Sequence, residues 1–396
     1  MMKSEAMTVM GYADLKGRKL EFFSHVSGTE YGYREPQTDT YAVLHPKNET
    51  EGVRYPLYVV FHSAGHDVYS AISCTLYEGN HDIYHAPEDM FGLYLDCRMN
   101  EKNDWWWGGN EAIGEGKPEL RGTALQPVER RVLAEIGTVM EAFPIDENRV
   151  YGVGNSMGGS GALGLGLNHG DIFAALIANV PAGVEHACER SRLGQEKPEG
   201  FSIPEPPVVM DYSAQNDIWS TGHELLYHGM ETEKYALIGY FGPFDHENNT
   251  TAIREVNDLV LTYDILSVRK DEAYPAFTHA SCNDPIPWKD NMESKLSGQV
   301  NAFFRYRNRE DTENGFSMDI RLADESEIRT KRKLPDTADA DVTLRRIQKF
   351  PIRPNEEIGY RFGDRTGTVK ADETGHITIP CITVTRETKQ LTLAKQ

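Results

Sequence analysis

The sequence has no apolar run of about 18 residues, the length that a membrane-spanning helix needs. Its first residues, M-M-K-S-E-A-M-T-V-M-G, lack the apolar core of a secretion signal. We therefore expect no contact with a membrane. The expected location is cytoplasmic, or outside the cell if a signal segment has already been removed.

Basic residues and cysteines are also scarce. Lys and Arg number 41 against 61 Asp and Glu, a net charge of −20, which disfavours nucleic acid and anionic surfaces as partners. The cysteines show no C-x-x-C spacing, so we expect free thiols, no metal site and no cofactor. His81 and His85 are four residues apart, and without a third ligand nearby in sequence they are expected to be a solvated pair. The five cysteines are Cys74, Cys97, Cys188, Cys282 and Cys381.

The most informative stretch that is present is R-V-Y-G-V-G-N-S-M-G-G-S-G-A, residues 149–162. Residues 149–153 form a short apolar run typical of a buried strand, and a helical pattern begins near Ala162. Between them stands a G-x-S-x-G motif, with Ser156 at its centre. A serine at a sharp strand-to-helix turn has its hydroxyl exposed at the end of a sheet. We therefore predict that Ser156 is a nucleophile.

Strand and helix patterns alternate through the first two thirds of the chain, which predicts an α/β fold with a doubly wound, mostly parallel sheet. Charged residues, glycines and prolines fill 181–207, which is expected to be an insertion or lid. In the expected helix 125–143, an apolar stripe faces inward, and Glu129, Arg130, Arg131 and Glu135 lie on the other side. The predicted strands are 19–26, 40–44, 57–61, 92–95, 149–153, 173–180, 207–212 and 236–241, and the other predicted helices are 224–230 and 249–270.

Helical patterns disappear after about residue 270, and D-P-I-P-W at 284–288 reads as a linker. Short alternating segments follow, separated by turn residues, which predicts an all-β domain of the immunoglobulin-like sandwich type. We therefore expect a catalytic domain at 1–285 and an accessory β-sandwich domain at 286–396. The predicted strands of this domain are 300–306, 316–322, 341–345, 357–362, 366–370, 376–382 and 390–394.

A serine nucleophile needs a base, and the base needs an acid that orients it. In an α/β fold with this elbow, both follow the serine in chain order, each just past a later strand. Asp217 lies in the loop after strand 207–212, and His246 lies in the turn after strand 236–241. We predict Asp217 as the acid, with Asp211 inside the strand as the alternative, and His246 as the base.

The oxyanion of the reaction needs two N–H donors. The first is expected from Met157, the residue after the nucleophile. The second is expected from Ala64, in the turn H-S-A-G-H that follows strand 57–61. His62 opens this turn and is expected to line the substrate site.

Three consecutive tryptophans, Trp105, Trp106 and Trp107, follow strand 92–95. Consecutive indoles cannot all point to one face, so at least one is expected to reach the carboxyl edge of the sheet and stack on a sugar or an aromatic acyl group. Trp219, two residues past Asp217, is expected in the same substrate site. The alternative is that these rings pack the loop against the domain.

The segment P-I-D-E-N-R-V-Y-G-V-G-N-S-M-G-G, residues 144–159, resembles the elbow of α/β-hydrolase serine esterases. The pattern I-D-x-x-R-V-Y-x-x-G-x-S-M-G-G is similar to that of feruloyl and acetyl-xylan esterases and of polyhydroxybutyrate depolymerases. The resemblance extends over about residues 40–270 and implies Ser156, Asp217 and His246 as the triad. Two departures stand out, since H-S-A-G replaces H-G-x-G at the oxyanion turn and the usual secretion signal is missing.

These features predict a serine carboxylesterase acting on feruloyl or acetyl groups of a plant-type polysaccharide or oligosaccharide. The same residues would also serve a serine peptidase or an acyltransferase. A non-catalytic carbohydrate-binding protein on a hydrolase scaffold is the alternative from another class.

Overall fold

The computed structural model describes residues 7–33, 35–79, 81–97, 104–109, 125–246, 263–288, 297–328 and 332–395. The chain divides into two compact units, one of residues 1–207 and 217–226, the other of residues 208–216 and 227–396. The predicted domain boundary at 285/286 does not coincide with this division and stays a prediction. None of the helices in the described ranges has the length and apolar character that crossing a membrane requires.

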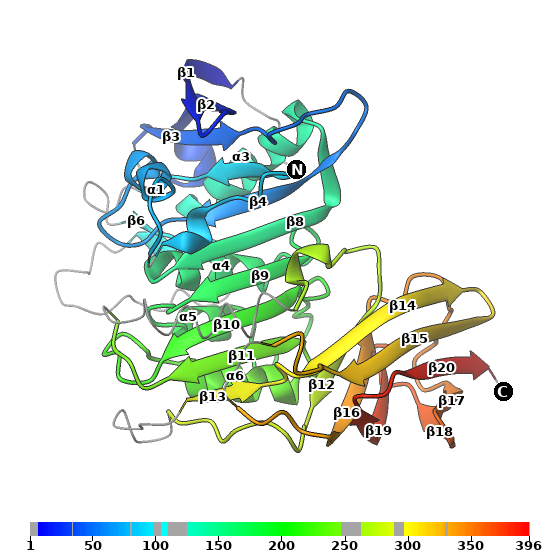
Figure 1. The fold of residues 1–396 in the computed structure, drawn as a ribbon. Helices are drawn as coiled ribbons and strands as arrows, with labels where there is room; N and C mark the ends of the chain where they lie inside the picture. Colours follow the sequence, from blue (N-terminus) through cyan, green and yellow to red (C-terminus); the bar gives the residue numbers. More distant parts are fainter. Residues whose placement is uncertain are drawn as a thin grey trace. The chain divides into compact units, whose positions relative to one another are not determined.

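The strands of the first unit follow the order β1-β2-β3-β5-β4-β8-β9 (Figure 1). β5, β4, β8 and β9 are mutually parallel, whereas β1, β2 and β3 are antiparallel to their neighbours. Every residue of β4 is buried, as expected for the centre of a sheet covered on both faces. The bounds are β1 Thr8–Leu15, β2 Arg18–Ser27, β3 Gln37–Leu44, β4 Tyr55–Phe61, β5 Phe91–Tyr94, β8 Ile145–Asn155 and β9 Ala175–Asn179.

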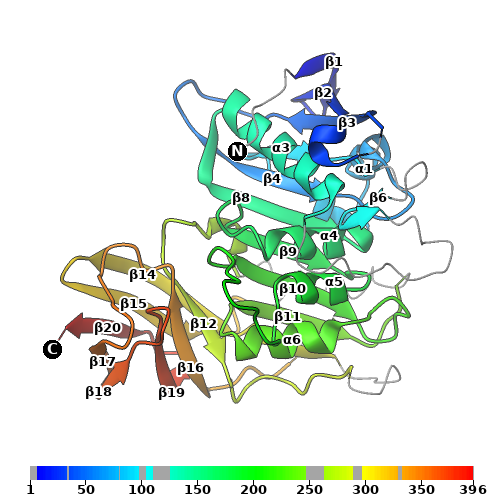
Figure 2. The same ribbon diagram turned by 180° about the vertical axis from the view of Figure 1, so that it is seen from behind.

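The longest helix of this unit, α3 (Pro127–Ala142), has sequence signals at its start. Pro127 occupies the first turn, and the Glu129 carboxylate accepts a hydrogen bond from the Gln126 backbone N–H at 2.7 Å. Figure 2 shows α3 and α4 in front of the strands of this sheet. The other elements are α1 Val68–Cys74, α4 Met157–Gly166, α5 Glu185–Arg190, the 3-10 turns η1 Thr29–Tyr31 and η2 Asp82–Tyr84, and the two-residue strands β6 Asp104–Trp105 and β7 Gly108–Gly109.

The side of α3 opposite its apolar stripe, where the sequence places four charged residues, is largely covered by the rest of the fold. Glu129, Arg131 and Glu135 are buried. The Glu129 carboxylate lies 2.8 Å from the Arg190 guanidinium, and Arg131 lies 3.1 Å from Glu135 and 3.4 Å from Asp39. Arg131 and Glu135 are four residues apart on the same helix, whereas Arg190 and Asp39 come from distant segments. Helical periodicity cannot reveal these two distant partners, which pair the buried charges.

The second unit contributes two parallel strands, β10 and β11, with the short strand β13 antiparallel to β11. The sequence predicts β11 as the last strand of the mostly parallel sheet, and β13 was not predicted. β13 has only three residues and therefore no alternation that a sequence pattern could show. The bounds are β10 Val208–Ala214, β11 Leu237–Gly242 and β13 Gly298–Val300, and helix α6 runs from His223 to Thr232.

The C-terminal part of this unit is entirely β in its described residues, as predicted. It has a three-stranded antiparallel sheet β12-β16-β19 and a five-stranded antiparallel sheet β14-β15-β20-β17-β18. The Phe277 ring of β12 stacks on Phe304 of β14, with ring centroids 4.1 Å apart. The bounds are β12 Tyr274–Thr278, β14 Phe304–Thr312, β15 Gly315–Leu322, β16 Thr337–Arg345, β17 Glu357–Phe362, β18 Arg365–Lys370, β19 Ile377–Thr385 and β20 Lys389–Lys395.

The segment between the two sets of strands differs from its prediction. β12 was missed, because its buried run lies before the proline-rich segment that we took as the domain linker. The predicted helix 249–270 lies mostly outside the described residues, and the part that is described forms only the 3-10 turn η4, Ile265–Ser267. The immunoglobulin-like connectivity of the sandwich stays a prediction.

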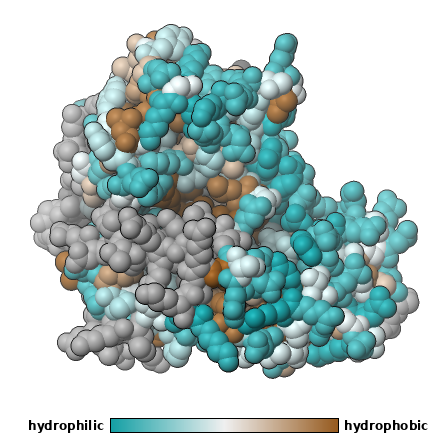
Figure 3. All heavy atoms as spheres, in the orientation of Figure 1, coloured by the Kyte–Doolittle hydropathy of each residue, from teal (hydrophilic) through white to brown (hydrophobic). Residues whose placement is uncertain are grey.

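Hydrophilic side chains cover most of the described surface on the face drawn in Figure 3, in keeping with the charge of −20.

Candidate active site

Ser156 stands between β8 and α4, at the turn predicted from the motif. Its φ of 57° and ψ of −121° lie in a region that side chains other than glycine rarely adopt. The backbone is fixed on both sides, because the Ser156 N–H donates to the Asn179 carbonyl at 2.9 Å and the Ser156 carbonyl accepts from Ala182 N–H at 3.2 Å. The strained conformation is therefore imposed by the end of β9 and the segment after it.

The two motif glycines allow the close approach that the turn requires. A Cβ on Gly154 would meet the Gly159 nitrogen at 2.7 Å, and it would overlap the carbonyl group of Gly158. A Cβ on Gly158 would overlap the carbonyl oxygen of Phe61, the last residue of β4. The first turn of α4 thus packs directly on the end of β4, and only glycine fits at either position.

The loop after β4 is attached to the elbow by a buried set of hydrogen bonds. The Ser63 hydroxyl donates to the Asn155 carbonyl at 2.9 Å, and the Asn155 amide donates back to that hydroxyl at 3.1 Å. The Ser63 N–H donates to the Tyr84 hydroxyl at 2.7 Å. These bonds fix the start of the turn that contains Ala64 relative to the residue before Ser156.

Both predicted oxyanion donors lie at the expected places in the chain. Met157 is the first residue of α4, where backbone N–H groups point out of the helix. Ala64 is exposed in a turn closed by a hydrogen bond from His66 N–H to the Ser63 carbonyl at 3.2 Å, and Gly65 in this turn has a φ of 75°. Their function as donors stays a prediction.

The expectation that His62 contacts substrate is wrong in this conformation. The residue is 1% exposed, and backbone groups occupy both ring nitrogens. Nδ1 donates to the Ser63 carbonyl at 2.8 Å, and Nε2 accepts the Cys97 N–H at 2.9 Å. The Asp96 carboxylate lies 3.4 Å from the same Nε2. His62 holds together the ends of β4 and β5.

The tryptophan loop is largely part of the packing, which corrects the substrate-binding prediction for Trp106 and Trp107. Both indoles are buried. Trp106 donates its Nε1–H to the His62 carbonyl at 2.9 Å. Trp107 stacks on His186 with ring centroids 4.1 Å apart and an interplanar angle of 19°. Trp105 is half-buried, and its contact with substrate stays a prediction.

The predicted insertion 181–207 takes part in this packing through α5. His186 is buried, and its Nε2 lies 3.2 Å from the Ser160 carbonyl. Burial lowers its pKa to about 3, so the ring is neutral. Arg190 of α5 donates to the Trp107 carbonyl at 3.0 Å and pairs with Glu129. Sequence reasoning missed both residues, because neither lies in a motif and their partners are distant in the chain.

Asp217 lies in the loop after β10, as predicted, and its carboxylate accepts the Trp219 N–H at 2.8 Å. The Trp219 side chain is 52% exposed, so its ring is free of the packing that holds Trp106. His223, at the start of α6, was not predicted. Burial lowers its pKa to about 4, and the nearby Asp217 opposes this shift.

Asp211, the alternative acid, lies inside β10 and is completely buried. Its Oδ2 accepts hydrogen bonds from the Ser213 hydroxyl at 2.6 Å and from the Tyr227 hydroxyl at 2.7 Å. Burial raises its pKa to about 7, more than these two donors lower it. These properties suit a structural carboxyl group better than the acid of a triad.

His246 follows β11 in a loop and is half-buried. Ser156 and Asp217 belong to the first unit of the chain, whereas His246 belongs to the second. The triad of these three residues is taken up below as a proposal.

No family model matches the chain, and no curated protein matches it. Among solved structures it is similar to an S-formylglutathione hydrolase from Agrobacterium tumefaciens, with a TM-score of 0.43 and 17% identity over 61% of this chain and 92% of that one. A fluorophosphonate-binding serine hydrolase from Staphylococcus aureus gives 0.40 and 12% over 59% and 96%. A ferulic acid esterase gives 0.38 and 14% over 57% and 91%.

Proposed function

We propose that the protein is a serine carboxylic ester hydrolase with Ser156 as its nucleophile. The observation that carries this proposal is the strained backbone of Ser156 between β8 and α4. Strain of this kind persists only where neighbouring groups impose it, and it is concentrated at functional sites. A serine in this turn, at the N-terminus of a helix, is suited to attack on a carbonyl group.

In the proposed mechanism the Ser156 Oγ attacks the ester carbonyl carbon while His246 takes the hydroxyl proton. Asp217 orients the imidazole, and the N–H groups of Met157 and Ala64 stabilise the oxyanion. The intermediate then collapses to an acyl-enzyme, and the leaving alcohol takes the proton from His246. Water, activated by the same histidine, releases the acid. These reaction steps need no cofactor.

We propose that the substrate is an acyl ester of a carbohydrate, with a feruloyl or acetyl group. The support is the exposed indole of Trp219, two residues after the proposed acid. A flat exposed ring suits stacking on a sugar or on an aromatic acyl group. Expected activity is therefore higher on feruloyl and acetyl sugars than on peptide amides.

Labelling with a fluorophosphonate tests the nucleophile. The wild-type protein is expected to gain one adduct on the peptide that contains Ser156, and Ser156→Ala is expected to gain none. No labelling of folded wild-type protein would support the non-catalytic carbohydrate-binding alternative. Turnover of peptide amides without ester hydrolysis would support a peptidase.

Two histidine variants test the base. His246→Gln is expected to lose several orders of magnitude in kcat on p-nitrophenyl acetate, as removal of a triad member does. His279→Gln, on an exposed residue, is the matched control and should keep its activity. If His223→Gln loses activity and His246→Gln keeps it, the base has been wrongly assigned.

The carbohydrate site is tested by Trp219→Ala. Loss of a stacking ring is expected to raise KM for feruloyl sugars by about 2- to 10-fold and leave p-nitrophenyl acetate unaffected. Ile218→Ala is the matched control, since Ile218 is the adjacent exposed apolar residue. Equal effects of the two variants would contradict a specific role for the indole.

A further inference from the structure

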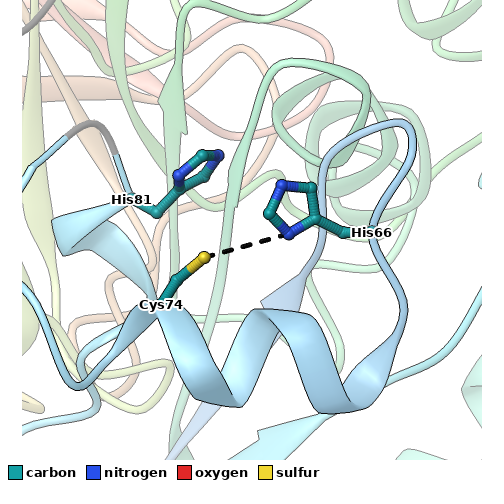
Figure 4. A group of neighbouring side chains, drawn as sticks. All are labelled: His66, Cys74 and His81. Carbon is teal, nitrogen blue, oxygen red and sulfur yellow. Dashed lines mark hydrogen bonds between the residues drawn. The ribbon is translucent and has the colours of Figure 1, made fainter.

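Three side chains with metal-binding atoms meet beside the turn after β4. His66 closes the turn, Cys74 is the last residue of α1, and His81 directly precedes η2. One nitrogen from each histidine and the cysteine Sγ all lie within 4.8 Å of one another. The His66 Nδ1 is 3.9 Å from the Cys74 Sγ, and Figure 4 shows this nitrogen facing the sulfur, with the His81 ring beside the His66 ring. The histidine pair considered from sequence, His81 and His85, is not the one that the fold brings together.

The state of these groups is compatible with metal binding. Burial lowers the pKa of His66, and it lowers the pKa of His81 to about 4. Each imidazole offers one nitrogen atom to the cluster. The Cys74 thiol would lose its proton on binding the metal, because the thiolate is the form that coordinates. All three residues are only half-buried, which leaves a path for an ion to enter.

The surrounding charge also favours a cation. The carboxylate of Asp67 acts on His66, and that of Asp82 acts on His81. Two imidazoles and one thiolate form a nitrogen and sulfur donor set, which suits Zn²⁺. Mg²⁺ and Ca²⁺ prefer oxygen ligands, so this donor set disfavours them. Three protein ligands leave one tetrahedral position for water.

We propose that His66, Cys74 and His81 bind one Zn²⁺ ion. The three ligand atoms lie within 4.8 Å of one another, which is somewhat wider than in a metal site with its ion bound. A small rotation of the side chains toward one another would bring all three atoms within bonding distance of one ion. The ion links the turn after β4, the end of α1 and the start of η2, and it adds to the hydrogen bond that the Ser63 N–H donates to Tyr84 of η2. It stabilises this corner of the first unit because it binds the folded chain and not the unfolded one.

The test uses the full chain, freed of metal with a chelator and titrated with Zn²⁺ by calorimetry and with Co²⁺ by absorption. One equivalent of Co²⁺ is expected, with the visible bands of a tetrahedral ion and a thiolate-to-cobalt charge-transfer band. Cys74→Ser should remove the charge-transfer band, and both it and His81→Gln should weaken binding at least tenfold. The matched controls are Cys381→Ser, on an exposed thiol, and His85→Gln. Both should bind as the wild type does.

A second measurement needs no variant. Alkylation by iodoacetamide, read residue by residue by mass spectrometry, should be slowed at Cys74 by one equivalent of Zn²⁺ and unchanged at Cys381. Absence of stoichiometric binding would overturn the proposal. Binding that persists undiminished in Cys74→Ser and His81→Gln, or equal protection of both cysteines, would assign the ion to another place and would likewise overturn it.

Discussion

Two substitutions of Ser156 separate the strain in its backbone from the chemistry of its hydroxyl. Ser156→Ala removes the hydroxyl but keeps the Cβ that makes a φ of 57° unfavourable. Ser156→Gly removes both. A backbone conformation of this kind costs about 1–3 kcal/mol, whereas glycine loses about 0.5–1 kcal/mol through the freedom it gains in the unfolded chain. Ser156→Gly should therefore be more stable than Ser156→Ala by about 0.5–2 kcal/mol, and both should lack esterase activity.

Urea unfolding monitored by tryptophan fluorescence is a suitable assay, because the buried Trp106 and Trp107 lie in the same unit as Ser156. The expected result is a higher midpoint for Ser156→Gly at an unchanged slope. If the glycine variant is equally stable or less stable, the elbow is not strained and the structural support for a nucleophile is lost. Activity in either variant would refute the assignment of Ser156 directly.

Two further predictions concern other buried positions. Gly158→Ala should destabilise the protein by about 3 kcal/mol or more, because the new Cβ overlaps the Phe61 carbonyl. Gly137→Ala, in α3 with no atom within 4 Å of the added carbon, should instead stabilise it by about 0.5–1 kcal/mol, and equal effects in urea unfolding would contradict this. For Asp211 the folded pKa of about 7 exceeds the ordinary 3.8, so the folded chain keeps a proton that the unfolded chain loses. Wild-type stability should fall by up to about 4 kcal/mol between about pH 4 and pH 7 relative to Asp211→Asn. Parallel pH curves for the two proteins would contradict this prediction.

The central strands and the elbow could be predicted because their signals are local. A strand such as β4, with every residue buried, appears in the sequence as a continuous apolar run. The elbow combines such a run with glycines at fixed spacing and a helical pattern after it. Edge strands carry no such signal. β1 buries only Leu15 among its eight residues, so its sequence has no apolar alternation to detect.

The surroundings of the candidate site could not be predicted, because they depend on partners far away in the chain. Glu129 is buried and pairs with Arg190, which lies far along the chain. Trp107 is buried and stacks on His186, which is also distant in sequence. The cluster of His66, Cys74 and His81 likewise has no recognisable spacing. A sequence pattern describes neighbours along the chain, whereas these contacts are fixed by how the elements pack.

The elbow is supported by groups close to it in the fold. Ser156 is held by the Asn179 carbonyl, the Ala182 N–H and the packing of Gly158 on β4. All of these groups lie in the first unit of the chain. These contacts hold the backbone of the turn at Ser156. If His246 is the base, as proposed, its substitution should lower the rate of attack while these contacts still hold the conformation of the turn.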